Sequence, residues 1–254
     1  MNSLDDQIKK FLPPHNRYSL LLDTSAGLVL GALPGLEDFG ASVSSVLSCL
    51  DGLVCSPGQL RRLGSTGADT ALLARMDWTN TLRDSSFLLP PESTTHIFIL
   101  DPKEAFELGA AGMVISFLLG YEEAIEAACL KAAVQLSLAG KDIGLPLVVE
   151  VRPNGPRVSL PAKAIELGAS YALESGVDVI VVPYPGLESL KTISVMVSVP
   201  WLLKPTSIEK TASEWEEALG LGASGLWLDH TWLRHAAPLL QISDRLHQLP
   251  ERAK

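Results

Sequence analysis

Eight short apolar runs, most of them separated by helical sequence, limit the fold of this chain more than any other feature. The apolar runs lie at 18–23, 50–56, 70–77, 108–117, 146–151, 175–184, 199–204 and 221–230. Strands separated mostly by helices are typical of parallel sheets covered by helices. Eight such units predict an α/β fold, a (β/α)₈ TIM barrel, in which functional residues follow the carboxyl ends of the strands.

Several segments between and beside these runs have helical periodicity. We expect helices at 3–12, 102–110, 120–140, 160–176 and 207–222, and a last helix from about 239. Ser3 and Asp101 are candidate N-caps, and Gly140 is the expected end of the third helix. The first helix would cover the bottom of the barrel. The polar segment 79–95 is expected to form a long loop or lid, and 95–100 remains unassigned.

Composition narrows the class of protein. The 254 residues suit one barrel domain, 1–254, and the net charge of −9 argues against a nucleic-acid partner. The cysteines at 49, 55 and 129 have no CxxC spacing, which favours a reducing compartment. The N-terminus lacks the pattern of a signal peptide, and no apolar stretch reaches the ~20 residues of a membrane helix. We therefore expect a cytoplasmic protein with no membrane partner.

Several fragments carry a family resemblance. The sequences at 102–126, 144–158 and 175–186 resemble strands four, five and six of the class I aldolases of the deoxyribose-phosphate and archaeal fructose-bisphosphate type. The sequence at 23–38 resembles the first loop of that family, and 75–81 resembles the end of its third strand. The resemblance implies a (β/α)₈ enzyme that binds a sugar carbonyl as a lysine Schiff base, with Asp23 and Asp77 matching active-site aspartates.

Four positions depart from the family pattern. Val181 stands where the resemblance places the Schiff-base lysine, and Arg152 stands where it places an acid–base tyrosine. Pro205-Thr206 replaces a glycine pair, and Asp229-His230 replaces a glycine-arginine pair, both of which serve phosphate binding in the family. The resemblance therefore supports the fold more strongly than it supports the catalytic mechanism of the family.

Lys204, at the end of the seventh strand, is the candidate nucleophile. A lysine in an enclosed apolar barrel mouth loses hydration, which favours the neutral, nucleophilic amine. A Schiff-base lysine moved from strand six to strand seven would stay at the same mouth. The alternative is a lysine that forms a salt bridge with Asp23 or Asp229 and has no covalent role.

The remaining strand ends carry acidic and basic side chains. Asp23 and Asp77 are candidate general bases, or caps of local loops. Glu150 and Arg152 lie on one side of a strand, so Arg152 either clamps a substrate anion or pairs with Glu150 internally. The further candidate substrate-binding residues are Asp229, His230, Thr206 and Ser207. His230 could titrate near neutrality, and the last two could hold an anion or simply cap the next helix.

Three functions remain open on the sequence. The first is an aldolase-like carbon–carbon lyase of carbohydrate metabolism, acting through Lys204 on a small polar carbonyl compound with or without a phosphate group. The second is a lyase in which Asp23, Asp77 and Glu150, together with Asp229 and His230, hold Mg²⁺ or Mn²⁺. The third is a non-catalytic barrel that binds a metabolite or a partner protein. We expect no nucleotide cofactor, because no glycine-rich loop has the required context, and we expect a homo-oligomer.

Overall fold

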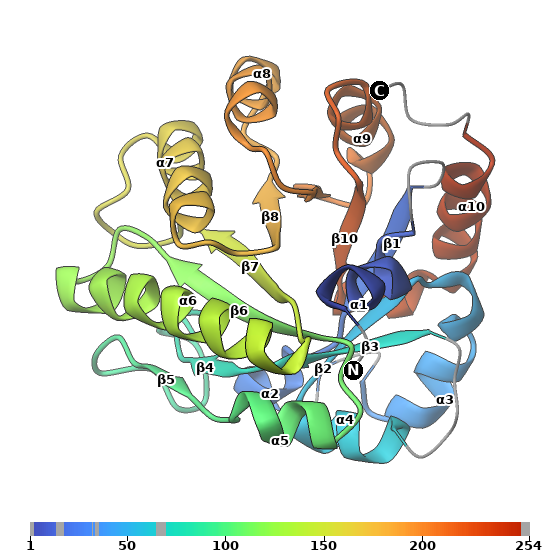
Figure 1. Cartoon of the computed structure of the whole chain (residues 1–254), viewed down its shortest axis with the longest axis horizontal. Helices are drawn as coiled ribbons and strands as arrows, with labels where there is room; N and C mark the ends of the chain where they lie inside the picture. The colour runs from blue at the N-terminus through green and yellow to red at the C-terminus, as the bar shows by residue number, and fades with distance from the viewer. Residues whose placement is uncertain (1–2, 14–17, 32, 34–35, 65–69, 250–254) are drawn as a thin grey trace.

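The chain forms a closed barrel of eight parallel strands (Figure 1). The computed structural model describes residues 3–13, 18–31, 33, 36–64 and 70–249. The barrel strands are β1 (Ser19–Asp23), β2 (Gly52–Cys55), β3 (Ala71–Arg75), β6 (Gly112–Leu118), β7 (Leu147–Arg152), β8 (Val179–Pro183), β9 (Trp201–Lys204) and β10 (Gly225–Asp229). Neighbouring strands follow the chain order, and β10 pairs with β1 to close the sheet. All eight expected strands and the predicted fold are confirmed.

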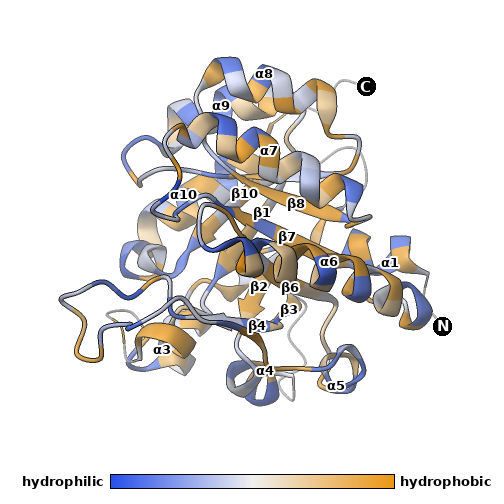
Figure 2. Ribbon diagram, turned by 90° about the vertical axis from the view of Figure 1, so that its left-hand side faces the viewer, coloured by the Kyte–Doolittle hydropathy of each residue, from blue (hydrophilic) through white to orange (hydrophobic). Residues whose placement is uncertain are grey.

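Helices surround the barrel, as Figure 1 shows. They are α1 (Leu4–Phe11), α2 (Gly27–Leu30), α3 (Phe39–Ser44), α4 (Pro57–Leu63), α5 (Pro102–Glu107), α6 (Glu123–Ile143), α7 (Pro161–Glu174), α8 (Leu187–Met196), α9 (Thr211–Gly220) and α10 (Ala236–His247), with the 3₁₀ turns η1 (Leu47–Cys49) and η2 (His230–His235). The barrel strands are hydrophobic along most of their length in Figure 2, whereas the helices carry both kinds of residue. Among the described residues, none of the helices has both the length and the apolar character to cross a membrane.

Two predicted helix starts are confirmed, and one predicted end is wrong. Ser3 and Asp101 cap α1 and α5, each through a reciprocal capping box. Helix α6 does not end at Gly140 but continues to Ile143, and Gly144 caps it with a φ of 72°. A Cβ at residue 140 would lie 2.3 Å from the carbonyl oxygen of Leu145. Glycine is therefore needed at 140 for close packing inside the helix.

The barrel interior is filled by its own set of apolar side chains. These are Leu21, Val54, Ala71, Leu73, Val114, Val148, Val179, Val181, Leu202 and Trp227, with Ala111. Phe11 and Leu12, at the end of α1, pack against the same cluster. Helix α1 thus closes the amino-terminal end of the barrel, as expected. A second, larger cluster lies between the strands and the surrounding helices.

The third barrel strand is shorter than predicted. Strand β3 ends at Arg75, and after Met76 the chain enters β4 (Asp77–Thr79), which pairs antiparallel with β5 (His96–Phe98). Asp77 therefore begins a two-stranded hairpin above the barrel, and the unassigned segment 95–100 supplies its second strand. The intervening residues 80–95 contain turns and bends without helix or strand, in agreement with the expected loop.

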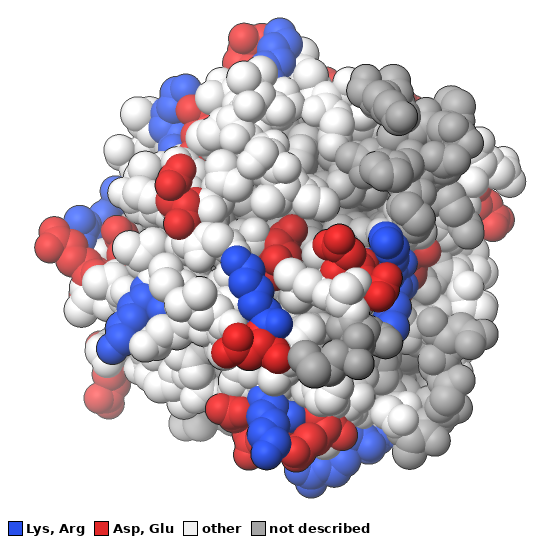
Figure 3. Space-filling view, in the orientation of Figure 1, with Lys and Arg blue, Asp and Glu red and all other residues white. Residues whose placement is uncertain are grey.

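The face of the molecule seen in Figure 3 carries acidic and basic side chains close to one another. Its described residues therefore show no extended field of one sign on that face.

Candidate active site at the barrel mouth

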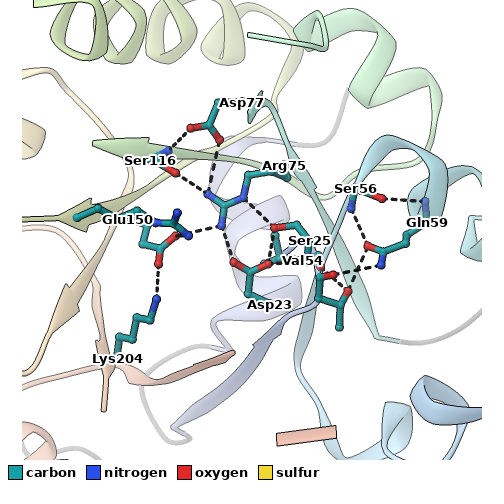
Figure 4. Close-up of polar contacts among 12 residues, drawn as sticks. Asp23, Ser25, Val54, Ser56, Gln59, Arg75, Asp77, Ser116, Glu150 and Lys204 are labelled. Carbon is teal, nitrogen blue, oxygen red and sulfur yellow. Dashed lines mark hydrogen bonds and ion pairs between the residues drawn. The ribbon is translucent and has the colours of Figure 1, made fainter. Parts of the chain in front are cut away.

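A buried arginine occupies the centre of the barrel mouth, the end at which the strands finish (Figure 4). The Arg75 guanidinium lies 2.5 Å from Asp23, 3.1 Å from Glu150 and 3.6 Å from Asp77, and it donates a hydrogen bond to Ser116 Oγ. Its side chain is 4% exposed. Burial alone would lower the pKa of Arg75, but the three carboxylates outweigh burial and raise it, so the guanidinium is permanently charged.

The charged residues reach this point because of strand alternation. Each lies two positions beyond a residue of the interior cluster, and side chains two apart share a face. The pairs are Leu21 with Asp23, Leu73 with Arg75, Val148 with Glu150, and Leu202 with Lys204. The mouth is therefore the polar continuation of the apolar interior.

Asp23 is fully engaged by its neighbours. Its Oδ1 accepts hydrogen bonds from the backbone N–H and the hydroxyl of Ser25, and its Oδ2 pairs with Arg75. The adjoining Thr24 donates to the Val54 carbonyl, and the Gln59 amide donates to the Thr24 carbonyl, which fixes the chain as it leaves β1 (Figure 4). These contacts give Asp23 the role of an anchor for both Arg75 and the first loop.

Glu150 connects three cations. It lies 2.7 Å from Lys204 Nζ, 3.0 Å from Arg152 and 3.1 Å from Arg75, and its side chain is fully buried. Burial opposes ionisation, but Arg152, Lys204 and Arg75 together outweigh it and hold the pKa of the Glu150 carboxyl well below its usual range. The expected internal pair of Glu150 with Arg152 is present. Lys204 forms a salt bridge too, with Glu150 as its partner.

We call Asp23, Arg75, Asp77, Glu150, Arg152 and Lys204 the central ion network. Each of its three cations pairs with at least one of its three carboxylates. Because unpaired buried charge is costly, this pairing is a condition for the fold as well as a property of the site.

Asp77 also belongs to a chain of three polar side chains that runs away from the mouth. Its Oδ2 accepts a hydrogen bond from the Ser116 backbone N–H and lies 2.8 Å from His96 Nε2, and His96 Nδ1 lies 3.4 Å from Cys129 Sγ. Burial lowers the pKa of His96, but Asp77 and Cys129 outweigh it and raise the pKa to about 9. For Asp77, burial has the opposite effect and raises the pKa. His96 and Arg75 outweigh burial and bring the pKa of Asp77 below its ordinary value.

Helix α2 forms a cover over the central ion network. The Leu28 carbonyl accepts from the Trp78 indole N–H, and the Val29 carbonyl accepts two hydrogen bonds from Arg83, whose guanidinium also stacks over the Trp78 ring. Beneath this cover lies a cavity of only about 30 Å³, lined in part by Asp23, Asp77 and Arg152. A volume near that of one water molecule leaves no room for a substrate at the centre.

A larger cavity opens to one side, between the ends of β9 and β10. Its volume is about 270 Å³, and its lining includes Lys204, Thr206, Ser207, Trp227 and Asp229. We call it the β9–β10 cavity. Lys204 thus belongs to both regions: its amine contacts Glu150, and its side chain, 28% exposed, lines the cavity.

The structure distributes the other predicted residues unequally. Thr206 donates both its backbone N–H and its hydroxyl to Glu214, and Asp229 accepts from the N–H and hydroxyl of Thr231 as the cap of η2. His230 is the first residue of η2 and is not among the residues that line the cavity. Val181 lies buried inside the barrel.

Arg75 and His96 were not predicted from the sequence. An arginine within an apolar strand run, in phase with inward-facing residues, was an available signal for Arg75. No sequence signal pointed to His96, because its contact with Asp77 depends on the pairing of β4 with β5.

The described residues do not fit a divalent metal ion at the mouth. Asp23, Asp77 and Glu150 all face the Arg75 guanidinium, which takes the central position that a cation bound by these carboxylates would need. Elsewhere in the described residues, no group of three or more histidine, cysteine, aspartate or glutamate side chains is arranged to hold one.

The closed parallel barrel with charged groups at its carboxyl end defines a TIM barrel with the architecture of the class I aldolases. An archaeal fructose-1,6-bisphosphate aldolase with its catalytic lysine bound to the carbinolamine intermediate superposes with a TM-score of 0.79 at 18% identity, covering 96% of this chain and 100% of that chain. The fructose-bisphosphate aldolase from Slackia heliotrinireducens gives 0.78 at 16% identity, covering 96% and 84%.

A 3-keto-L-gulonate-6-phosphate decarboxylase from Vibrio cholerae is a more distant structural neighbour, with a TM-score of 0.55 at 13% identity over 91% of this chain and 99% of that one. No protein-family model and no curated protein sequence matches the chain. The expected resemblance to the aldolases is therefore confirmed as a likeness of fold.

Proposed function

We propose that the chain is a carbon–carbon lyase that forms a Schiff base on Lys204 with a small hydroxylated carbonyl compound. One observation carries this proposal: the Lys204 amine sits at the border between a buried carboxylate and an open cavity. It contacts Glu150 at 2.7 Å, while the same side chain lines about 270 Å³ of space. A substrate carbonyl in that cavity can approach the amine without displacing the central ion network.

The reaction begins with loss of a proton from the Lys204 ammonium. Glu150 accepts a hydrogen bond from it, but Arg152 and Arg75 favour the ionised carboxylate, so water in the cavity and not Glu150 takes the proton. The neutral amine then adds to the carbonyl carbon, and loss of water gives an iminium ion.

Cleavage moves the carbon–carbon bond pair into the iminium, leaving an enamine, while the β-hydroxyl loses its proton and becomes the carbonyl of the departing fragment. A water molecule in the β9–β10 cavity is the candidate acceptor for that proton. Asp77 is kept ionised by its lowered pKa, but it lines the central cavity, which has no room for a substrate. Water that protonates the enamine and hydrolyses the product imine would return Lys204 to its starting form.

Arg152 acts through Glu150 in this scheme. Its terminal nitrogen pairs with the carboxylate that contacts Lys204, and its side chain lines the central cavity. Asp23 holds the network in place.

The test is borohydride trapping with a panel of small aldehydes, ketones and sugar phosphates, read by intact mass and peptide mapping. We expect an adduct on Lys204 that disappears in Lys204→Met and persists in the control Lys163→Met, an exposed lysine on α7. An adduct retained in Lys204→Met would overturn the assignment, and no adduct with any carbonyl would overturn Schiff-base chemistry.

A second candidate is a barrel that binds a metabolite without converting it. Two observations favour it: Val181 replaces the lysine implied by the aldolase resemblance, and the centre of the mouth is filled. A carbonyl compound that raises the melting temperature equally in the wild type and in Lys204→Met, without a trapped adduct, would support this function.

The expected homo-oligomer remains a prediction. Leu130, Val134 and Leu138 follow one another on the outer face of α6 and are 40–60% exposed. Light scattering on the purified chain measures the oligomeric state.

A further inference from the structure

The β9–β10 cavity lies where TIM barrels often bind phosphate. The loops after the seventh and eighth strands of such barrels offer backbone N–H groups, and helix starts favour anions. In this chain, Thr206 follows β9 and Thr231 follows β10, and both line the cavity. Their backbone and hydroxyl groups are the donors that an incoming phosphate would need.

Glu214 already occupies the first pair of donors. The Thr206 backbone N–H donates to Glu214 Oε2 at 2.8 Å, and the Thr206 hydroxyl donates to Oε1 at 2.5 Å. Both carboxylate oxygens are thus engaged by one residue, in the bidentate arrangement that a bound oxyanion would adopt. Glu214 comes from the first turn of α9 and is only 5% exposed, so solvent does not readily displace it.

Asp229 occupies the second pair. Its Oδ1 accepts the Thr231 backbone N–H at 2.9 Å and also the Thr231 hydroxyl. The cap of η2 and the loop after β9 therefore show the same pattern: a threonine whose two donors are satisfied by a carboxylate of the chain itself.

The charged residues around the cavity also disfavour a bound anion. Glu209 and Asp229 line it, and Glu214 lies directly behind Thr206. Lys204 is the lining cation, and its charge is already paired with Glu150. A phosphate or carboxylate entering the cavity would meet two or three like charges and one cation whose charge is compensated.

One lining residue carries an uncharged side-chain donor that lacks a partner. Trp227 Nε1 is buried with no hydrogen-bond partner, and the residue lines the cavity. Leaving such a group unsatisfied is costly, so a ligand oxygen that accepts from it would be favoured. A hydroxyl or carbonyl oxygen meets that need without bringing negative charge.

We propose that the β9–β10 cavity takes the uncharged, hydroxyl-bearing part of a ligand and excludes phosphate and carboxylate groups, with Glu214 as the specificity-determining residue. Only the identification of that ligand as the carbonyl substrate of Lys204 rests on the proposed function. The occupation of the donors by Glu214 and Asp229 does not.

The experiment is a titration with inorganic phosphate, followed by the backbone amide NMR signals of Thr206 and Thr231. We expect no saturable shift in the wild type. In Glu214→Ala the vacated donors should bind phosphate at least about tenfold more tightly than in the wild type. The control is Glu216→Ala, an exposed carboxylate on the same helix that pairs with Arg245 and should behave as the wild type does.

A saturable shift in the wild type would overturn the proposal, as would a Glu214→Ala protein that folds and gains no phosphate binding over the control. If Glu214→Ala does not fold, the proposal is tested on the wild type by the NMR signal of the Trp227 indole N–H. That signal should move with glyceraldehyde and not with glyceraldehyde 3-phosphate; a response to the phosphate, or to neither compound, overturns the proposal.

This outcome is separable from that of Schiff-base trapping. Failure of Lys204 to form an adduct leaves the phosphate titration unaffected. Trapping that succeeds only with phosphorylated aldehydes would support Lys204 and overturn the exclusion of phosphate.

Discussion

The centre of the barrel mouth and its β9–β10 side use charge in opposite ways. At the centre, carboxylates surround the Arg75 guanidinium under a cover, and about 30 Å³ remains. On the β9–β10 side, carboxylates satisfy neutral threonine donors at the edge of a cavity of about 270 Å³. The difference teaches that charged residues at strand ends need not all serve one site. Here ion pairs fill the centre, and the side contains the space that we propose a ligand enters.

The strongest way to break this comparison is to remove the central cation. Arg75→Met leaves Asp23 and Glu150 buried beside an apolar side chain, and loss of one partner from a buried ion pair costs about 3–5 kcal/mol. We expect a loss of that size in the free energy of unfolding, measured in urea.

The control for this variant is Arg157→Met, because Arg157 pairs with Glu123 and both side chains are more than half exposed. Its expected loss is below about 1 kcal/mol. Equal losses in the two variants would show that the central ion network has no structural role.

The hairpin side of the network predicts a pH dependence. The pKa of His96 is raised from 6.5 to about 9, so its contribution is fully present below pH 6.5 and is lost as the pH rises through about 9. This shift corresponds to roughly 3 kcal/mol. We expect the wild type to lose stability over that range.

In His96→Gln the ring that titrates is absent while a side-chain donor to Asp77 remains. Unfolding curves at a series of pH values should therefore show a much flatter profile between pH 6.5 and 9. An unchanged slope would mean that another group causes the pH dependence.

A smaller effect is expected at the border between the two regions. In Lys204→Met, Glu150 keeps Arg75 and Arg152, so the loss of stability should be about 1–2 kcal/mol, less than in Arg75→Met. Schiff-base trapping should disappear completely. A loss as large as that of Arg75→Met would place Lys204 with the structural residues of the centre.

The smallest effect belongs to the cavity side. Asp229→Ala removes the cap of η2, which should cost about 0.5–1 kcal/mol, and it should leave the pH profile of His96 unchanged. Thermal unfolding of this variant against the wild type measures the cost. A loss above that of Lys204→Met would mean that the cavity side is as structural as the centre.

The sequence predicted the barrel because alternation and glycine turns are local signals. It also placed Asp23, Glu150, Arg152 and Lys204 at one mouth, since parallel strands end together. The sequence could not predict which of these side chains pair with one another. The carboxylate that contacts Lys204 depends on packing between strands that are far apart in the chain. Arg75 stands within an apolar run, in phase with the inward-facing residues, but that signal does not show which carboxylates it meets.

Two further residues escaped for related reasons. His96 reaches Asp77 only through the antiparallel pairing of β4 with β5, which followed from no clear periodicity. Glu214 reads as an ordinary helix residue, and its contact with Thr206 shows only once the loop after β9 is in place.

The contacts of Arg75 also have a consequence for how the chain folds. Its partners lie 41 residues away at Ser116, 52 at Asp23 and 75 at Glu150. Contacts of such long sequence separation form late, because the intervening chain must be ordered first. An intermediate lacking β7 would therefore contain Arg75 and Asp23 without Glu150. When β7 docks, Glu150 would form its ion pair with an Arg75 side chain that is already in place. Completion of the barrel and neutralisation of its mouth should then occur in a single kinetic step, whose rate Arg75→Met would change.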